Sequence, residues 1–528
     1  MMRARFLIRE INGSHSPWEM LRRARSIATP IEHGETNATN DLQNARSVND
    51  IPGPKALPVL GNWFRFIPYI GEYGNANMIT RLRMLREQYG NIVKLDGLLN
   101  SRSTVFLFSP ELCEKMYRNE GTWPLRQSME CMHYYRTSRK DIYGEMYGLP
   151  TSQGKIWHNF RSKVNPYMMQ PRMVQAHIAP ISKVTSDFVE RMRTLKDPKT
   201  LELPDNFLNE LYKWALESIC LIAMNCRLGC LRPNLTADSE PQIMINCVHD
   251  MFDLIYRLEI LPSLWKVYNT RNLRKFFRVM DTFNEIIGKH IERAETKLRE
   301  TTDGTDLQDH SVLEKLLRID KQTAHIMALD MLTGGVDTTG NMAAGLLYYL
   351  ATNPEKQEKL REEVMSVLPD KTSPVTHNVL SQTKYAKACI KESLRLFPVA
   401  IGTLRTVPTD VCLGGYKIPK GYDVLLVHEL LTLEPTQFPR PEEYIPERWL
   451  RGNTKFPSAK EAHPFSYMPF GFGPRTCIGR RFSEMEVETL VLTVIRNFRI
   501  EWHHGPFEYE SRFINTVSTP MRLKLVDL

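Results

Sequence analysis

The sequence lacks the apolar run that a membrane-spanning helix needs, since none of its stretches reaches the required length of about 18 apolar residues. Paired C-x-x-C motifs are also missing, and nine scattered cysteines in 528 residues are too few for a disulfide scaffold of the secreted type. No glycine fingerprint for a nucleotide and no aromatic, basic nucleic-acid motif occurs. The net charge of +9 favours acidic partners or anionic lipid over nucleic acid.

The first 50 residues differ in composition from the rest of the chain. Residues 1–30 are rich in arginine, with serine and threonine between the cations and no apolar signal-peptide core, which favours a mitochondrial transit peptide. The alternative is a disordered basic tail that carries no targeting signal. Residues 31–50 are polar and are predicted to be disordered. The stiff segment Ile51-Pro52-Gly53-Pro54 is predicted to begin the folded domain, so that residues 1–50 form a leader and linker.

A glycine-rich turn at residues 470–479 carries a single cysteine, Cys477, and continues into an amphipathic helix. Gly471 and Gly473 allow the positive φ angles of a tight turn, and Gly479 leaves room for a flat ligand close to the backbone. The sulfur is predicted to lie at a helix N-terminus, where free N–H groups and the helix dipole favour a thiolate. We call residues 470–479 the cysteine loop.

The alternative for Cys477 is an inert buried thiol, as most isolated cysteines are. The spacing argues against it, because Phe, Gly, Arg, Cys and Gly at these offsets would occur by chance on the order of 10⁻⁴ times in such a chain. The loop resembles the F-x-x-G-x-R-x-C-x-G signature of the cytochrome P-450 family. The resemblance implies haem b as cofactor, Cys477 as the axial iron ligand, and a cofactor-binding role for Phe470, Gly473, Arg475 and Gly479.

Trp157 and Arg161 lie four residues apart and are predicted to share a helix face. Taken alone they could be a surface cation over an aromatic ring. The P-450 family has a W-x-x-x-R helix at this place in the chain order, whose side chains bind the haem propionates. The resemblance therefore implies that Trp157 and Arg161 bind the cofactor, with Arg475 and Arg405 completing a cationic clamp on the two carboxylates.

A second motif lies inside a long apolar helix. Two adjacent glycines, Gly334 and Gly335, lower the stability of the helix by about 2 kcal/mol relative to alanine. Either a ligand close to the backbone or close helix packing would explain their presence. The hydroxyl of Thr338 is predicted to reach the carbonyl of Gly334 and to kink the helix. The motif resembles the family's oxygen-binding pattern, which implies that both glycines border the cofactor and that Asp337 and Thr338 are catalytic, relaying protons to bound dioxygen.

Glu392 and Arg395 would ordinarily form a weak surface ion pair on a helix. Arg448 in a following Pro-Glu-Arg-Trp motif resembles the third member of the Glu-Arg-Arg network that the family buries behind haem. We therefore assign these three residues a structural role. Trp449 stands where phenylalanine is commoner in the family, a difference that puts little in doubt.

The resemblance extends from Ile51 to the C-terminus and implies one domain, residues 51–528, that is mainly α with small β-sheets and encloses haem. Short apolar stretches at 91–95 and 104–108 are predicted strands of a small sheet. The implied activity is a monooxygenase that inserts one atom of O2 into a lipophilic substrate, a steroid or a xenobiotic. Five segments are expected to form its pocket: 123–149, 247–261, 328–335, 399–403 and 514–518.

The chain carries no electron-transfer cofactor motif of its own, so a partner must supply electrons. It looks most like insect mitochondrial members, which implies an acidic ferredoxin as donor and the matrix face of the inner membrane as location. The predicted ferredoxin contact consists of Lys387, Lys391, Arg480 and Arg481. The apolar stretch 260–266, followed by basic residues, is a candidate peripheral membrane contact, and an exposed loop between helices is the alternative. A microsomal enzyme served by a flavoprotein reductase and a haem carrier or sensor without turnover are the alternatives.

Overall fold

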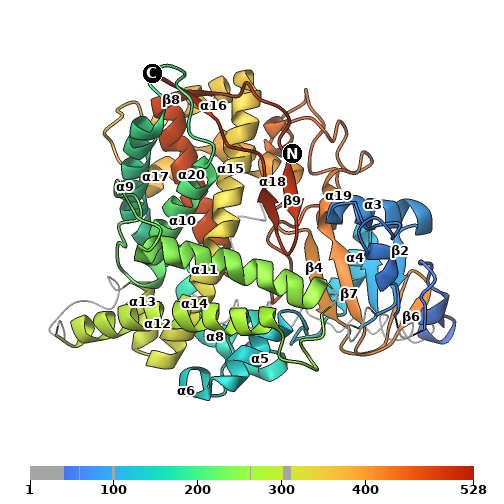
Figure 1. Ribbon diagram of the computed structural model, residues 1–528. Coiled ribbons are helices and arrows are strands. Elements are labelled where there is room, and N and C mark those ends of the chain that lie inside the picture. Colours follow the sequence, from blue (N-terminus) through green and yellow to red (C-terminus); the bar gives the residue numbers. More distant parts are fainter. Residues whose placement is uncertain (1–40, 59, 98–101, 262, 301–310) are drawn as a thin grey trace, which may run out of the picture.

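The computed structural model describes residues 41–58, 60–97, 102–261, 263–300 and 311–528 (Figure 1). Helices dominate, as predicted. The helices are α3 (Met78–Tyr89), α4 (Pro110–Arg118), α5 (Glu130–Ser138), α6 (Lys140–Tyr143), α7 (Gly148–Thr151), α8 (Gly154–Met169), α9 (Pro171–Leu195), α10 (Phe207–Ala223), α11 (Glu240–Ile255), α12 (Arg271–Glu300), α13 (Val312–Leu317), α14 (Lys321–Gly335), α15 (Asp337–Thr352), α16 (Pro354–Val367), α17 (His377–Gln382), α18 (Lys384–Leu396), α19 (His428–Thr432) and α20 (Arg480–Asn497), with short helical turns η1 (Val48–Asp50), η2 (Trp63–Phe66), η5 (Pro446–Trp449) and η6 (Pro464–Ser466) and one π-helical turn η3 (Tyr256–Ile260).

The largest sheet of the described chain has four strands in the order β2-β3-β7-β4. The two strands predicted from the sequence are its first pair, since β2 (Ile92–Leu95) and β3 (Thr104–Leu107) run antiparallel. β3 then pairs in parallel with β7 (Asp423–Val427), which pairs antiparallel with β4 (Gly402–Thr406). The other strands are β1 (Arg46–Ser47), β5 (Val411–Leu413) and β6 (Tyr416–Ile418) in one sheet, and the pairs β9 (Tyr509–Ser511) with β10 (Asn515–Val517) and β8 (Phe498–Glu501) with β11 (Lys524–Asp527). In Figure 1, β2, β4, β6 and β7 lie at one side of the helical body, whereas β8 lies beside α16 near the C-terminus.

The ordered chain begins before the predicted boundary at Ile51. β1 pairs in parallel with Tyr416 and Lys417 of β6, and the Ser47 hydroxyl caps the turn η1 in a capping box with Asp50. The prediction of disorder is therefore wrong for residues 46–50, because their backbone groups find partners in a distant hairpin. The basic leader and residues 31–40 lie outside the described residues.

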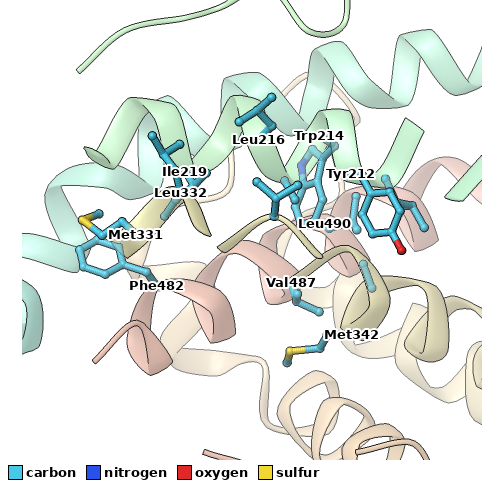
Figure 2. Packing of buried hydrophobic residues seen from close by; sticks show 14 of the residues in the cluster. Tyr212, Trp214, Leu216, Ile219, Met331, Leu332, Met342, Phe482, Val487 and Leu490 are labelled. Carbon is cyan, nitrogen blue, oxygen red and sulfur yellow. The ribbon is translucent and has the colours of Figure 1, made fainter. Parts of the chain in front are cut away.

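The core that positions the site is built from α10, the broken helix α14–α15, and α20. Trp214 and Leu216 on α10, Leu332 on α14, and Val487 and Leu490 on α20 are almost fully buried and lie together in Figure 2. The glycine pair ends α14 at Gly335, and α15 starts at Asp337, so the predicted break in the long helix is present. The cysteine loop leads directly into α20 at Arg480. The core thus fixes the broken helix and the cysteine loop relative to each other.

Candidate functional site

A large cavity of about 800 Å³ lies between the cysteine loop and the break in the long helix. Cys477 lies on its wall, and Gly334 and Thr338 at the helix break line the same cavity. Apart from Asp337 and Gly473, every residue predicted for the site lines it: Trp157, Arg161, Gly334, Gly335, Thr338, Arg405, Phe470, Arg475, Cys477 and Gly479. The folding of the chain therefore brings together motifs that are more than 300 residues apart in the sequence.

The cysteine loop adopts the predicted tight turn. Gly471 and Gly473 have φ angles of 72° and 76°, and the amide of Cys477 donates to the carbonyl of Phe470 at 2.9 Å. A side chain at Gly473 would place its Cβ 2.2 Å from an oxygen of Glu120. Gly473 therefore serves the turn and the close approach of a buried carboxylate, and it does not face the cavity.

Cys477 is the exposed member of the nine cysteines, all of which lie in described residues. Its thiol opens onto the cavity, so it is accessible to a ligand there. Burial raises the pKa of the Cys477 thiol, although the N–H groups of Gly479 and Arg480 and the charge of Arg161 act in the other direction. The N–H groups at the helix N-terminus therefore favour the thiolate, as predicted, but do not outweigh burial. A cation bound at the sulfur would supply the missing stabilisation.

Several arginines crowd one side of the cavity without enough anions. The Arg475 guanidinium donates to the carbonyls of Pro124 and Ser152 and lies over the Trp157 ring at 4.4 Å, yet its Nη1 atom is buried without a partner. Arg161 donates to the carbonyl of Thr476 at 2.9 Å, and its Nε atom is likewise unpartnered. Burial, first, and neighbouring cations lower the pKa of Arg475 to about 8.

Arginine keeps its proton in proteins, so this lowered pKa expresses the cost of holding a buried cation beside others. Arg126, a third arginine with an unpartnered nitrogen and a lowered pKa, was not predicted from the sequence. It lines the cavity, its Nε atom is unpartnered, and burial lowers its pKa to about 10. Nothing in the Trp-Pro-Leu-Arg segment around it signals this role. In the described part of the chain no carboxylate forms an ion pair with these three cations, since the nearby Asp330 and Glu120 pair with Arg136 and Arg405.

Arg405, from β4, differs from the other arginines. Its Nε atom donates to Glu120 at 2.5 Å, and both side chains are nearly completely buried. Tyr117 covers the guanidinium, whose carbon lies 5.2 Å from the ring centroid. Arg405 therefore lines the cavity as predicted, but its charge is already balanced by a carboxylate 285 positions away in the sequence. This balance leaves Arg126, Arg161 and Arg475 as the cations that a ligand would neutralise.

The two glycines of the broken helix have different reasons to be glycine. A Cβ on Gly334 would meet nothing within 4 Å, so this position opens into the cavity. A Cβ on Gly335 would lie 2.9 Å from the side chain of Ile219 on α10, so this position is set by helix packing. The hydroxyl of Thr338 donates to the carbonyl of Gly334 at 2.5 Å, as predicted from the sequence.

Asp337 does not face the cavity. It is 4% exposed, and its Oδ1 atom lies 3.1 Å from Nε2 of His249 on α11. The sequence placed Asp337 beside Thr338 in a shared relay, but consecutive helical residues point in different directions, so the two side chains lie on different faces of α15. His249 was not singled out from the sequence, because only the packing of α11 on the broken helix reveals it.

The Glu392 network is present and fully formed behind the cavity. Both oxygens of Glu392 accept bonds from Arg395 at 2.9 and 3.1 Å, and Arg448 donates to one of them at 2.9 Å. The indole of Trp449 donates to the other at 2.8 Å. The residue that departs from the family pattern is therefore a fourth member of the network, since phenylalanine could not make this bond.

All five predicted pocket segments contribute to the cavity lining, but only segment 399–403 does so along its whole length. Segment 247–261 contributes from Leu258 onward, and segment 514–518 contributes Ile514. Residues of η2 and α3, including Trp63, Phe66 and Leu82, also line the cavity and were not predicted from the sequence. The lining is mostly apolar, which suits a lipophilic ligand.

The site has the features that a haem held by a thiolate requires. A sulfur opens onto the cavity, a helix break offers open space, and three arginines have a buried nitrogen without the anion that two propionates would supply. These residues fit haem, whose iron suits the sulfur and whose carboxylates suit the arginines. Fold and site together define a haem-thiolate protein.

Comparison with known proteins gives the family. The cytochrome P450 family model matches residues 51–524. "Cytochrome P450 CYP12A2" of Musca domestica is 38% identical and covers 93% of both chains, and "Probable cytochrome P450 12a5, mitochondrial" of Drosophila melanogaster is 40% identical and covers 87% of both. The haem domain of cytochrome P450DA superposes with a TM-score of 0.72 over 90% of this chain and 98% of its own, at 18% identity, which bears on the fold alone.

This chain belongs to the cytochrome P450 family. It is thus a monooxygenase that binds haem through a cysteine thiolate and uses O2 and lipophilic substrates. In the described residues no helix is long and apolar enough to span a bilayer.

Proposed function

We propose that this protein is a mitochondrial monooxygenase that receives electrons from an acidic ferredoxin and oxidises a steroid or a xenobiotic. The observation that carries the proposal is the cavity itself, in which the Cys477 sulfur and the open helix position at Gly334 line one apolar space. Haem bound there supplies the activation of O2 for transfer of one oxygen atom to a C–H bond. Cys477 would be its axial ligand, with Phe470 and Gly479 beside the ring.

The residues of this chain would act around that cofactor in three ways. Arg126, Arg161 and Arg475, with Trp157, would hold the propionates and so fix the ring in the cavity. Gly334 would leave space for O2, which argues against a carrier with a second protein ligand. The Oγ1 atom of Thr338 would hold a proton beside that space, anchored by its bond to the Gly334 carbonyl.

The ligand assignment is tested by a carbon monoxide difference spectrum of the reduced protein and of the Cys477→Ala variant. We expect the wild type to show the red-shifted band of a thiolate-ligated haem and the variant to lose it. Cys412→Ala, which changes a buried thiol outside the cavity lining, is the matched control and should keep the band. A shifted band that survives Cys477→Ala would show that another residue is the ligand.

The proposed ferredoxin contact can be narrowed from four cations to two. Lys387 lies 3.6 Å from Glu488, and Arg480 pairs with Glu484 at 3.1 Å, so part of their charge is balanced. Lys391 and Arg481 are exposed, and no carboxylate of the described chain forms an ion pair with either. We expect these two to carry most of the attraction to an acidic partner.

This docking proposal is tested by reconstitution with a mitochondrial ferredoxin and its reductase, and separately with a microsomal flavoprotein reductase. Lys391→Glu and Arg481→Glu should each raise the ferredoxin concentration needed for half-maximal reduction, most strongly at low ionic strength. Lys140→Glu is the control, because this exposed lysine lies on α6, far from α18 in Figure 1. Efficient turnover with the flavoprotein reductase alone would favour the microsomal alternative.

The location at the matrix face of the inner membrane is part of the same proposal. Relatives that carry "mitochondrial" in their names support it. The stretch after η3 exposes Leu264, Val267 and Tyr268, with Val267 at 79% exposure, as a peripheral membrane contact would. A Leu264→Ser, Val267→Ser variant should bind vesicles of mitochondrial lipid more weakly than wild type, whereas Met365→Ser, an exposed apolar residue on α16, should not.

For the substrate, binding spectra against sterols and lipophilic xenobiotics are the informative screen. A ligand that enters the cavity and displaces water from the haem iron shifts the absorption of the haem. Preference for sterols over xenobiotics, or the reverse, would decide between the two substrate classes. No response from either class would contradict the lipophilic assignment.

A further inference from the structure

His249 connects a buried acid at the active site to solvent. Its Nε2 atom lies 3.1 Å from Oδ1 of Asp337, and the side chains are 38% and 6% exposed, respectively. Among the described residues, no lysine or arginine forms an ion pair with Asp337, so His249 is the cationic partner of this carboxylate. The imidazole therefore spans the distance between water and an acid that water reaches poorly.

Neighbouring residues hold this imidazole in place. The Tyr212 ring on α10 packs against it at a centroid distance of 4.7 Å, edge to face. The Asn341 amide donates to the Tyr212 hydroxyl at 3.1 Å and to the Asp337 carbonyl at 2.8 Å, which ties the tyrosine to the first turn of α15. A Cβ on Gly340 would lie 2.5 Å from the Tyr212 ring, so glycine makes room for it. Three helices, α10, α11 and α15, therefore contribute residues to this contact.

The charges around His249 favour its protonated form. Burial lowers the pKa of the imidazole, but the Asp337 carboxylate on α15, and after it Asp250 on α11 itself, outweigh burial and raise the pKa of His249 above its ordinary value. Asp250 is in turn paired with Lys275 of α12 at 2.7 Å. From α10 the facing group is Tyr212, which stays neutral because burial raises its pKa well above its ordinary value.

We propose that His249 is the positioning residue that returns protons from solvent to Asp337 during turnover. This inference rests on the proposed monooxygenase function and on the assignment, implied by the family resemblance, of Asp337 as the acid that supplies protons to the site. The reaction consumes two protons and two electrons with each O2 while one oxygen atom enters the substrate and the other leaves as water. The imidazolium of His249 would pass its Nε2 proton to Oδ1 of Asp337 and keep the proton on Nδ1. A proton from water then returns to Nε2 and restores the cation, so His249 ends each cycle unchanged.

The contact also joins proton supply to the substrate pocket. α11 continues into the π-helical turn η3, where Leu258 and Glu259 line the cavity. Nε2 and Oδ1 are in contact but not aligned as a hydrogen bond, so a small rotation of the ring or shift of α11 completes the bond. His249 and the cavity residues Leu258 and Glu259 therefore belong to one continuous helical segment.

The test compares His249→Gln with His290→Gln. His290 on α12 pairs with Glu240 at 2.6 Å and is the matched histidine–carboxylate pair away from Asp337. With 7-ethoxycoumarin as lipophilic probe and the ferredoxin system as donor, we expect His249→Gln to release several-fold more hydrogen peroxide per NADPH than wild type. His290→Gln should match wild type. The carbon monoxide spectrum of each variant verifies that haem is loaded normally.

A second readout does not depend on turnover. Because the folded pKa of His249 is raised, its contact stabilises the fold fully below the unfolded pKa of about 6.5 and loses this effect as pH rises through the folded value. The stability difference between wild type and His249→Gln should therefore be largest at acid pH and shrink as the solution becomes alkaline. A difference that stays constant with pH would contradict the ion pair.

His249→Lys separates proton transfer from simple charge pairing. Lysine keeps a cation beside Asp337, but its ordinary pKa of about 10.4 makes it a poor donor at neutral pH. We expect His249→Lys to recover the stability of the wild type but not its coupling, that is, its low release of hydrogen peroxide per NADPH. Full recovery of coupling would overturn the proposal. Normal coupling in His249→Gln together with loss in Asp337→Asn would mean another proton route, with the proposed function intact. If the thiolate band is absent, the proposed function itself fails.

Discussion

The glycine pair of the broken helix offers a sharp test, because two chemically identical substitutions should have opposite effects. In a helix, alanine is favoured over glycine by about 1 kcal/mol. Gly334→Ala meets nothing within 4 Å, so it should gain most of this amount. Gly335→Ala places its methyl 2.9 Å from Ile219, and overpacking of this kind costs about 1–3 kcal/mol. The two variants should therefore differ by about 1–3 kcal/mol in unfolding free energy, with Gly334→Ala the more stable.

The assay is urea unfolding of both variants, accompanied by titration of the reduced protein with carbon monoxide. The methyl of Gly334→Ala projects into the cavity, so this variant should bind carbon monoxide more weakly while being more stable. Gly335→Ala should be less stable than Gly334→Ala and should bind carbon monoxide more tightly than that variant does. In an Ile219→Ala background the penalty of Gly335→Ala should disappear, since the contacting Cγ1 and Cδ1 atoms are gone. Equal stability of the two glycine variants would refute the packing argument.

Three further predictions concern buried polar groups. Trp449→Phe removes one donor from the buried Glu392 and should cost about 1–3 kcal/mol in urea unfolding, with an unchanged midpoint contradicting its place in the network. Gly148→Ala puts a Cβ 2.2 Å from Nη1 of Arg136 at a φ of +74°, so it should lower the thermal midpoint more than Gly121→Ala at the same φ in open space. Burial raises the pKa of Glu486 from 4.5 to about 8. The wild type should therefore lose stability relative to Glu486→Gln as the pH rises through this range. Stability profiles of the two proteins that run parallel with pH would argue against a buried neutral acid.

Local chemistry explains which parts of the site were predictable. The turn at 470–479 and the break at 334–338 depend on positive φ angles, missing side chains and a hydroxyl four residues from a carbonyl, all of which are visible in a short stretch of sequence. The strands β2 and β3 were likewise found from their apolar pattern. The helical fold followed from the family resemblance that these motifs support.

Contacts between distant segments could not be predicted. The pairing of β1 with β6 depends on a hairpin 370 positions later in the chain, and the partner of Asp337 comes from a helix with no motif of its own. Periodicity shows that α11 has an apolar face but not which polar residue at its edge meets another helix. The role of Gly335 was ambiguous for the same reason, because Ile219 lies on α10.

The two arginine clusters show how structure separates a binding site from a scaffold. From sequence, both were arginines matched to a family pattern. In the scaffold, Arg395 places its guanidinium on Glu392 and on three backbone carbonyls, those of Thr432, Pro441 and Glu443, so its donors are satisfied within the chain. At the cavity, Arg161 and Arg475 each keep a buried nitrogen without a partner. Arg136 and Arg496 also keep a buried nitrogen without a partner but lie outside the cavity lining, so the deficit points to a bound anion where the arginine also lines the cavity, as Arg161 and Arg475 do. An unmet hydrogen bond together with a place on the cavity wall, and not the motif alone, therefore marks the arginines that would hold the cofactor.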